Sequence, residues 1–430
     1  MDTNTAHALV HFGLGRRGSE PLPRDPKAWL LRQLHAQDLP RIDPPATTEF
    51  GLLTLRRDRE NRANKPAEPG ARPLFTRQAN AELVHALTTP APFRERLVWF
   101  WTNHFTISVR RGECTAVACA FIEEAIRPHV AGTFADMLLA VMRHPAMLMY
   151  LDNARSIGPT SQAASVRGGG LNENLARECL ELHTVTPAAG YSQTDVTALA
   201  RVLTGWSIDL QRDPPGYQFR ARAHEPGAQT VMGRSFPPGE EGGVAALRFL
   251  GTHPATYRFL ATKLTRHFTT DAPDPADIRR VEAALFNTSG NLAAAVEAIV
   301  SLDSAWRPGT KLRSPQDLVI AAIRALDPPE TNRPNIPGVL AALGQPFLTA
   351  PAPNGWPDVA ADWSSPEAMM RRIDWANGFA GRLGARDPME IADTALGPLL
   401  RPATRDAMAL AGSRRDAFTL LLTSPEFQRR

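Results

Sequence analysis

Amphipathic helical periodicity recurs along most of this chain and limits its possible folds more than any other feature. Apolar residues return every three or four positions in segments that Gly- and Pro-containing turns separate, which is typical of helices that bury one face. The segments expected to be helical are 5–12, 25–34, 76–87, 92–107, 113–126, 134–142, 145–150, 172–183, 192–206, 244–250, 254–268, 276–285, 292–301, 314–326, 366–383 and 414–422. The sequence therefore predicts a mainly α fold, a large multi-helix globular domain.

One stretch departs from the helical pattern. Between Ser207 and Phe236, short alternating segments at 217–219 and 230–232 stand among Pro and Gly turns, which predicts a small β-ribbon insertion. We therefore expect an N-terminal helical lobe (1–206), an irregular segment with the ribbon (207–240) and a C-terminal helical lobe (241–430) packed on the first. The Pro-rich connections are too short to act as free linkers.

Charge and hydropathy exclude some classes of partner. The formal charge of the 430 residues is +4, and no dense Lys/Arg block interleaved with aromatic residues is present, so no nucleic-acid partner is expected. No apolar run approaches the roughly 18 residues of a membrane span, so no membrane association is expected. The N-terminus shows no signal-peptide pattern, which predicts a cytoplasmic protein. Three cysteines that match no metal spacing also suit a reducing compartment.

The 172–183 segment carries the most suggestive polar pattern. On a helix, its apolar residues fall on one side and its polar residues within an arc of roughly 100°. The polar stripe consists of Asn174, Arg177, Glu178 and Glu181. Such a stripe is either a solvated face or part of a site. The long loop at 156–171 just before it favours a site, because loops of that length in compact domains are usually functional or disordered.

Glu178 and Glu181 are three residues apart and can approach each other on a helix. Two such carboxylates bind a cation, divide acid and base roles between them, or pair with arginine. Arg177 stands four residues before Glu181, so an ion pair between them explains one carboxylate without any site.

Four further residues are candidates outside the stripe. His104 lies among aromatic residues near the end of a predicted helix, as a packed core histidine or as a rigidly held base or ligand. His224 lies in the irregular segment, where reactive groups are often placed. Asp152 and Trp206 are expected to contact a substrate, or else to act as a cap and a core anchor.

The sequence lacks the best-known catalytic motifs. It has no Gly-x-Ser-x-Gly, no His-Glu-x-x-His and no Gly-x-Gly-x-x-Gly after a predicted strand, so serine-hydrolase, zinc-protease and dinucleotide-binding chemistry are unsupported.

Several motifs together resemble a known bacterial family, catalogued as domain of unknown function 1800. The matching stretches are 103–105, 145–153, 170–178, 181–184, 191–196, 200–206, 224–227, 312–315 and 424–427. The resemblance implies no settled activity or cofactor. It implies that relatives are often exported and are commonly encoded beside a sulfatase-like family, so a sulfatase-like partner is expected. This sequence departs from that pattern in showing no signal peptide.

These observations predict an enzyme with a polar acid/base or metal-assisted pocket. Catalysis is assigned to His104, Arg177 and Glu178, and substrate contacts to Asn174, Asp152 and Trp206. Metal ligands are expected at Glu178, Glu181, His104 and His224, with roughly one manganese, iron or zinc ion per chain. Two alternatives stay open: a haem or redox-metal protein, and a non-catalytic partner protein in which the stripe is an interface.

Overall fold

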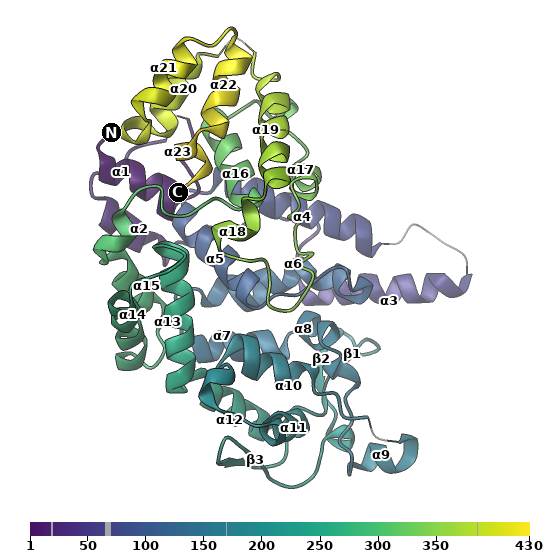
Figure 1. The fold of residues 1–430 in the computed structure, drawn as a ribbon. Coiled ribbons are helices and arrows are strands. Elements are labelled where there is room, and N and C mark those ends of the chain that lie inside the picture. Colours follow the sequence, from purple (N-terminus) through teal and green to yellow (C-terminus); the bar gives the residue numbers. More distant parts are fainter. Residues whose placement is uncertain (19, 65–69, 169, 385) are drawn as a thin grey trace.

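The computed structural model describes residues 1–18, 20–64, 70–168, 170–384 and 386–430. Over these residues the chain forms 23 α-helices, four short strands and several 3-10 and π-helical turns. The mainly α prediction is confirmed (Figure 1).

The helices of the first half are α1 (Thr3–His7), α2 (Pro26–Gln33), α3 (Thr48–Asn64), α4 (Ala71–Thr88), α5 (Pro92–His104), α6 (Ala118–Phe121), α7 (Phe134–Arg143), α8 (Pro145–Tyr150), α9 (Gln162–Arg167), α10 (Asn174–Glu178) and α11 (Gln193–Val202). Those of the second half are α12 (Glu240–Gly251), α13 (Pro254–Phe268), α14 (Pro275–Asn287), α15 (Leu292–Val300), α16 (Pro315–Leu326), α17 (Ile336–Ala342), α18 (Ala360–Trp363), α19 (Pro366–Ala380), α20 (Pro388–Ala395), α21 (Pro402–Ala409), α22 (Arg414–Thr423) and α23 (Pro425–Gln428).

Many of these helices begin as their sequence requires. A capping side chain accepts a hydrogen bond from a first-turn backbone N–H, and proline often follows it at the first helical position, where no N–H is needed. Asp25 caps α2 in this way and Ser314 caps α16. Ser192 and Asp195 form a full capping box at α11.

The β insertion consists of two separate hairpins rather than one ribbon. Strand β1 (Trp206–Asp209) pairs antiparallel with β2 (Gly216–Phe219), and β3 (Gln229–Val231) pairs with β4 (Arg234–Phe236). The second hairpin is attached to α11, because the backbone N–H of Met232 donates to Asp195 Oδ1 over 2.6 Å.

Two hydrophobic cores organise the molecule. The larger is built from residues between Ala8 and Ala305, and the smaller from residues between Leu318 and Phe427 together with parts of η1 (Ala8–Phe12) and α4. In Figure 1, α16, α17 and α19–α23 lie at the top, α7–α12 and the strands at the bottom, and α4–α6 between them. Helices α13–α15 run along one side and belong to the larger core. The division at 206 and 240 stays a prediction.

Some elements were not expected. Helices α20 and α21 lie in a stretch where apolar periodicity predicted no helix. A capping signal is present there, because Asp387 is an N-cap and Pro388 follows it at the first helical position. The 156–171 segment, apart from Gly169, which lies outside the described residues, contains the short helix α9.

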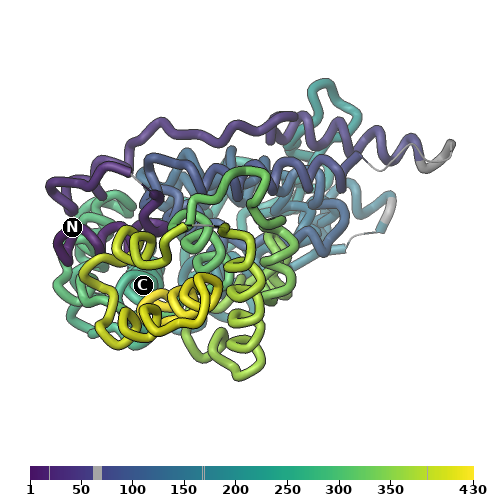
Figure 2. Tube along the Cα trace, turned by 90° about the horizontal axis from the view of Figure 1, so that it is seen from above, coloured from purple at the N-terminus to yellow at the C-terminus, as the bar shows by residue number. Residues whose placement is uncertain are grey.

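Both ends of the chain lie on the same side of the molecule (Figures 1 and 2). The backbone of Arg430 exchanges two hydrogen bonds with that of Lys311, at 2.8 and 3.1 Å. This pairing fixes the last residues between the two cores.

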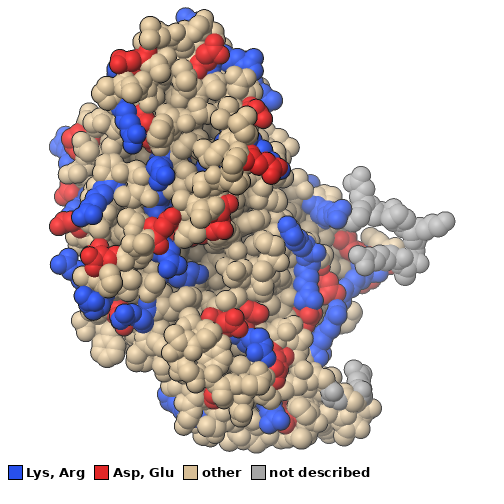
Figure 3. All heavy atoms as spheres, in the orientation of Figure 1, with Lys and Arg blue, Asp and Glu red and all other residues tan. Residues whose placement is uncertain are grey.

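On the face drawn in Figure 3, acidic and basic side chains are interspersed over most of the surface. This agrees with the small formal charge. Within the described residues, no helix combines the length and apolar character needed to cross a membrane.

Candidate functional site

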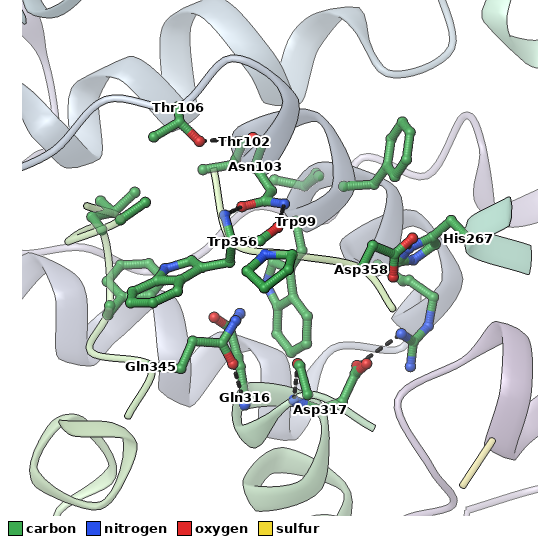
Figure 4. Close-up of a pocket in the computed structure, with 18 of the residues that line it drawn as sticks. Trp99, Thr102, Asn103, Thr106, His267, Gln316, Asp317, Gln345, Trp356 and Asp358 are labelled. Carbon is green, nitrogen blue, oxygen red and sulfur yellow. Dashed lines mark hydrogen bonds and ion pairs between the residues drawn. The ribbon is translucent and has the colours of Figure 1, made fainter. Parts of the chain in front are cut away.

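A pocket of about 120 Å³ lies where the two cores meet, and we refer to it as the junction pocket. Its walls come from α5, from the N-terminal end of α16, from the irregular 345–363 segment and from His267 near the end of α13 (Figure 4). One face of α5 contributes Arg96, Trp99 and Asn103, which are spaced three and four residues apart and therefore share that face.

Indole rings form much of the pocket wall. Trp99 lies in the middle of the close-up, with Trp356 on one side of it and the Asp358–His267 pair on the other (Figure 4). Trp363 packs against Trp356 with ring centroids 6.1 Å apart. Indole faces pack well against apolar ring faces, and each indole keeps one N–H donor.

Asn103 positions Trp356. Its side-chain amide donates to the Trp356 carbonyl over 2.8 Å and accepts from the Trp356 backbone N–H over 2.7 Å. Gly355 allows this close approach: its φ is +79°, and a Cβ at this position would stand 2.4 Å from the Asn103 carbonyl oxygen. Asn103 and Gly355 therefore fix the loop that carries the indole.

Asp317, in the first turn of α16, is the charged floor of the pocket. Arg96 Nη1 stands 2.7 Å from one carboxylate oxygen and Arg430 Nε 3.4 Å from the other. Burial raises the pKa of Asp317, but the charges of Arg96, Arg430 and Arg313 outweigh burial and hold the pKa at about 2. Because Arg96 belongs to α5 and Asp317 to α16, this ion pair joins the two cores.

A second charged group lies at the other side of the pocket. His267 Nδ1 stands 3.1 Å from Asp358 Oδ2, and its Nε2 is 3.2 Å from Arg430 Nη2. Since the arginine can only donate, Nε2 is an acceptor and Nδ1 carries the proton. Burial lowers the His267 pKa to about 4, with Asp358 opposing and Arg430 adding to the shift. His267 is therefore neutral near pH 7.

Asp358 is ionised in this setting. Burial raises its pKa, but His267, Lys311 and Arg430 outweigh burial and keep the pKa well below its usual value. The Lys311 ammonium group stands 3.7 Å from Asp358 Oδ1 and 2.5 Å from Asp271 Oδ1. Asp358 remains partly exposed, so its carboxylate can accept hydrogen bonds from a ligand.

A buried ionic cluster lies behind the aromatic wall. Arg127 contacts Glu82, Glu95 and Glu123, and its Nη2 lies 2.9 Å from Glu82 Oε2 and 3.3 Å from Glu95 Oε1. Burial and Glu123 raise the pKa of Glu82 well above its usual value, against the effect of Arg127. Burial also raises the Glu95 pKa, but Arg127 outweighs burial and leaves it lowered. These shifts favour the neutral form of Glu82 and the ionised form of Glu95.

The main charged side chains of the pocket are paired. The four cations that hold it, Arg96, Arg127, Lys311 and Arg430, each contact at least one carboxylate, which for Arg127 includes Glu95. Removing either partner of such buried pairs is costly, so the charges are fixed in place. The arrangement suits an uncharged ligand.

His104 lies outside the junction pocket. It is the last residue of α5 and is 2 % exposed. Its Nε2 stands 3.2 Å from the His183 carbonyl oxygen and its Nδ1 stands 3.1 Å from Lys263 Nζ. Both ring nitrogens are thus engaged, one of them beside an amine, so His104 cannot ligate a metal ion in this arrangement.

The polar stripe folds differently from the expectation. Only Asn174–Glu178 is α-helical, and the next five residues, Cys179–His183, form a π-turn whose hydrogen bonds span five residues rather than four. The predicted pairing of Arg177 with Glu181 is wrong. Arg177 instead pairs with Glu173 over 2.9 Å, since Glu173 is four residues away on the regular side of the helix.

Glu178 and Glu181 do come near each other. Burial and the Glu181 charge raise the pKa of Glu178. Glu181 and Asn174 are exposed. The stripe is therefore a mainly solvated face, with Glu178 its most buried carboxylate.

The remaining predicted residues are each engaged by other parts of the protein. His224 is buried, with Nδ1 2.9 Å from the Thr204 carbonyl oxygen and Nε2 accepting from the Gly239 N–H over 2.7 Å. Trp206 is fully buried in the larger core. Asp152, at a φ of +60°, pairs with Arg111 over 2.6 Å.

The predicted metal set does not converge. Within the part of the chain that the structure describes, no three His, Cys, Asp or Glu side chains are grouped so that they could hold a metal ion. Glu178, Glu181, His104 and His224 therefore do not form one site, because His104 and His224 direct both nitrogens to protein partners.

Sequence reasoning missed the junction pocket almost entirely. Trp356 and Asp358 stand in an irregular stretch without periodicity, and His267 ends a helix like many others. Two signals of the pocket are nevertheless present in the sequence. One is the long irregular 345–362 segment, which carries Trp356 and Asp358. The other is the spacing of Arg96, Trp99 and Asn103, three and four residues apart on one helix.

Comparison with known families identifies the family of this chain. The family model described as Protein of unknown function (DUF1800) matches residues 7–429. Comparisons with the curated proteins and with the solved structures found no match.

Proposed function

The chain belongs to the DUF1800 family, and we propose that its function is to bind a neutral, hydroxyl-bearing six-membered ring, such as one pyranose unit, in the junction pocket. The observation that carries this proposal is the combination of indole walls with a rim of polar groups whose charges are already balanced. Clefts of this composition are the usual sites of small-molecule recognition.

The size of the pocket supports a single ring. Its volume is about 120 Å³, which is somewhat less than the roughly 150 Å³ of an apolar cavity that holds one benzene molecule, so the pocket has room for no more than one ring. The pocket is only partly enclosed, so substituents on the ring can extend toward solvent.

The polar rim supports hydroxyl groups. The side-chain oxygen of Gln345 accepts from the Gln316 backbone N–H over 2.9 Å, which leaves its NH₂ group to donate. Trp99 and Trp356 line the pocket and each indole carries one N–H donor, and Asp358 offers carboxylate oxygens. Hydroxyl groups both donate and accept, so they match this mixture.

The charge balance supports an uncharged ligand. An anionic ligand would compete with Asp317 and Asp358 for their cations, and a cationic ligand would compete with those cations for the carboxylates. Either exchange would disturb buried ion pairs, each of which is costly to break.

Binding of N-acetyl-D-glucosamine, D-glucose and myo-inositol to the whole protein tests the proposal. A ligand with about 12 to 15 non-hydrogen atoms is expected to bind with a Kd of about 1 mM, so titrations should reach about 50 mM. Tryptophan fluorescence should change saturably, and the thermal unfolding temperature should rise.

A pair of variants identifies the site. Trp356→Leu should weaken binding by about 5- to 30-fold, because losing an aromatic contact costs about 1–2 kcal/mol. Trp375→Leu, a matched change in α19 outside the junction pocket, should leave binding unchanged. Binding of phenol but of none of the three polyols would replace the proposed ligand class, and binding of no probe at all would refute the proposal.

The other sequence-based expectations have no structural support of their own. The haem alternative relied on His104, whose two nitrogens are engaged by His183 and Lys263. The sulfatase-like partner, the interface role of the stripe and the cytoplasmic location stay predictions.

A further inference from the structure

We propose that Lys263 is a nucleophilic amine that forms an imine with small aldehydes or ketones, with His104 as its proton acceptor. The site is separate from the junction pocket, so this inference does not rest on the proposed function. Lys263 lies on α13 and is partly exposed, whereas His104 and His183 beneath it are fully buried.

The hydrogen bonds define the proton positions. The His183 carbonyl oxygen can only accept, so His104 Nε2 carries the ring proton in the 3.2 Å contact between them. His104 Nδ1 is then unprotonated and accepts from Lys263 Nζ over 3.1 Å. A base is therefore placed directly against the amine.

The surroundings hold the histidine rigidly in that role. The His104 ring packs against Phe105, Phe134 and Phe259, with centroids between 4.5 and 6.0 Å away. Burial and the Lys263 charge keep the His104 pKa well below its usual value, so the imidazole is neutral and its Nδ1 lone pair faces the amine.

Burial favours the neutral form of the amine. Burial lowers the pKa of Lys263 to about 8, with Asp358 opposing the shift and Arg266 adding to it. The other titratable neighbours, His104 and His183, are themselves neutral, since burial lowers the His183 pKa to about 3. At pH 7 about 9 % of Lys263 would be uncharged, against about 0.04 % for an ordinary lysine with a pKa of about 10.4. Lysines desolvated in this way serve as Schiff-base nucleophiles.

The reaction balances without any added oxidant or reductant. The Nζ lone pair adds to the carbonyl carbon, forming the C–N bond, while the carbonyl π electrons move to oxygen. His104 Nδ1 takes one proton from the new ammonium group and returns it to the carbinolamine oxygen. The carbinolamine N–H then gives its proton through His104 Nδ1 to the hydroxyl group, the C–O bond breaks, and water leaves as the nitrogen lone pair forms the C=N bond. Addition of water reverses this sequence and regenerates the amine.

A reactivity comparison within one protein tests the inference. The chain has only four lysines, Lys27, Lys65, Lys263 and Lys311. The folded protein is treated with propanal and sodium cyanoborohydride at pH 7, and the N-propyl adducts are located by peptide mass spectrometry. Lys263 should be alkylated at least tenfold faster than the exposed Lys27. Lys311, buried in its ion pairs, should stay unmodified.

A pH series measures the same property without a carbonyl compound. Trace labelling with acetic anhydride from pH 6 to 11 should give Lys263 a half-maximal reactivity near pH 8. In His104→Gln the preference of propanal for Lys263 should fall at least fivefold, whereas Thr262→Ala, a change beside it on α13, should leave the preference intact.

Two results would overturn the inference. One is a Lys263 labelling midpoint above pH 10, and the other is propanal reactivity no greater than that of Lys27. Both come from the unaltered protein, so the inference stays testable even if His104→Gln does not fold. Failure of the sugar-binding experiments would leave these measurements unaffected.

Discussion

The Asp317→Asn variant tests how the two cores are joined at the floor of the junction pocket. Asparagine keeps the shape of the side chain but removes the charge that faces Arg96 and Arg430. Lowering a carboxyl pKa from about 3.9 in the unfolded chain to about 2 in the folded protein contributes about 2.6 kcal/mol at pH 7. Leaving two buried guanidinium groups with less compensation adds to the loss, so we expect a cost of about 3 kcal/mol.

The dependence of this cost on pH has a defined sign. Because the folded-state pKa is the lower one, the stabilisation is complete above pH 3.9 and is lost as the pH falls toward 2. The ionisation contribution should fall to about half at pH 3. The difference between wild type and Asp317→Asn should therefore shrink on acidification.

Urea unfolding followed by tryptophan fluorescence at pH 7 and pH 3 measures the effect. With a slope of about 3 kcal/mol/M, the midpoint should move by about 1 M at pH 7. Asp374→Asn, a matched change at an exposed carboxylate on α19, should cost less than about 0.5 kcal/mol. An unchanged midpoint in Asp317→Asn, or a difference that does not shrink at pH 3, would refute the reasoning.

Three further variants follow from the same contacts. Asn103→Ala removes both hydrogen bonds to Trp356, so it should lower the free energy of unfolding by about 1–2 kcal/mol and should also weaken the binding of N-acetyl-D-glucosamine. Unaltered binding would show that the Trp356 indole needs no support from Asn103. Gly355→Ala should cost more than about 1 kcal/mol by thermal unfolding, since its positive φ and the nearby Asn103 carbonyl both oppose a Cβ. Arg127→Met should cost about 3–5 kcal/mol at pH 7. Because Glu95 would then have a raised pKa, that cost should be smaller at pH 5, and an equal cost at both pH values would argue against the ionised state of Glu95.

The fold could be predicted from local signals wherever they agreed. Helices such as α2 and α11 combine a capping side chain with an apolar face, and both begin where they were expected. The predicted end of α11 at 206 is wrong, because the helix ends at Val202 and Trp206 begins β1. Turn residues and alternation predicted one small β-ribbon in this region, where the structure has two separate hairpins. Helix α20 was missed because its apolar face is short, although its capping signal was present.

The candidate site could not be predicted in the same way, because it is built from segments far apart in the sequence. The contact between Arg96 and Asp317 spans 221 residues, and that between Asn103 and Trp356 spans 253. Hydrophobic periodicity describes neighbours along one helix or strand and does not predict contacts between residues so far apart in the sequence. His104 was identified as a chemically interesting residue, but its partner Lys263 is 159 residues away and stands in an ordinary amphipathic helix.

For the polar stripe, the sequence pattern predicted an arrangement of side chains that the structure does not have. A regular helix was assumed from 172 to 183, and the position of Glu181 depended on that regularity. The π-turn at Cys179–His183 changes the spacing, and Arg177 finds Glu173 instead. A polar stripe that is inferred from steps of 100° per residue is therefore correct only where the helix is a regular α-helix.

A crystal of the protein soaked with N-acetyl-D-glucosamine at about 50 mM would test the central claim most directly. The account predicts density for one ring against the indoles of Trp99 and Trp356, within hydrogen-bonding distance of the Gln345 amide. Density for the sugar elsewhere on the molecule, with the junction pocket holding only water, would contradict it.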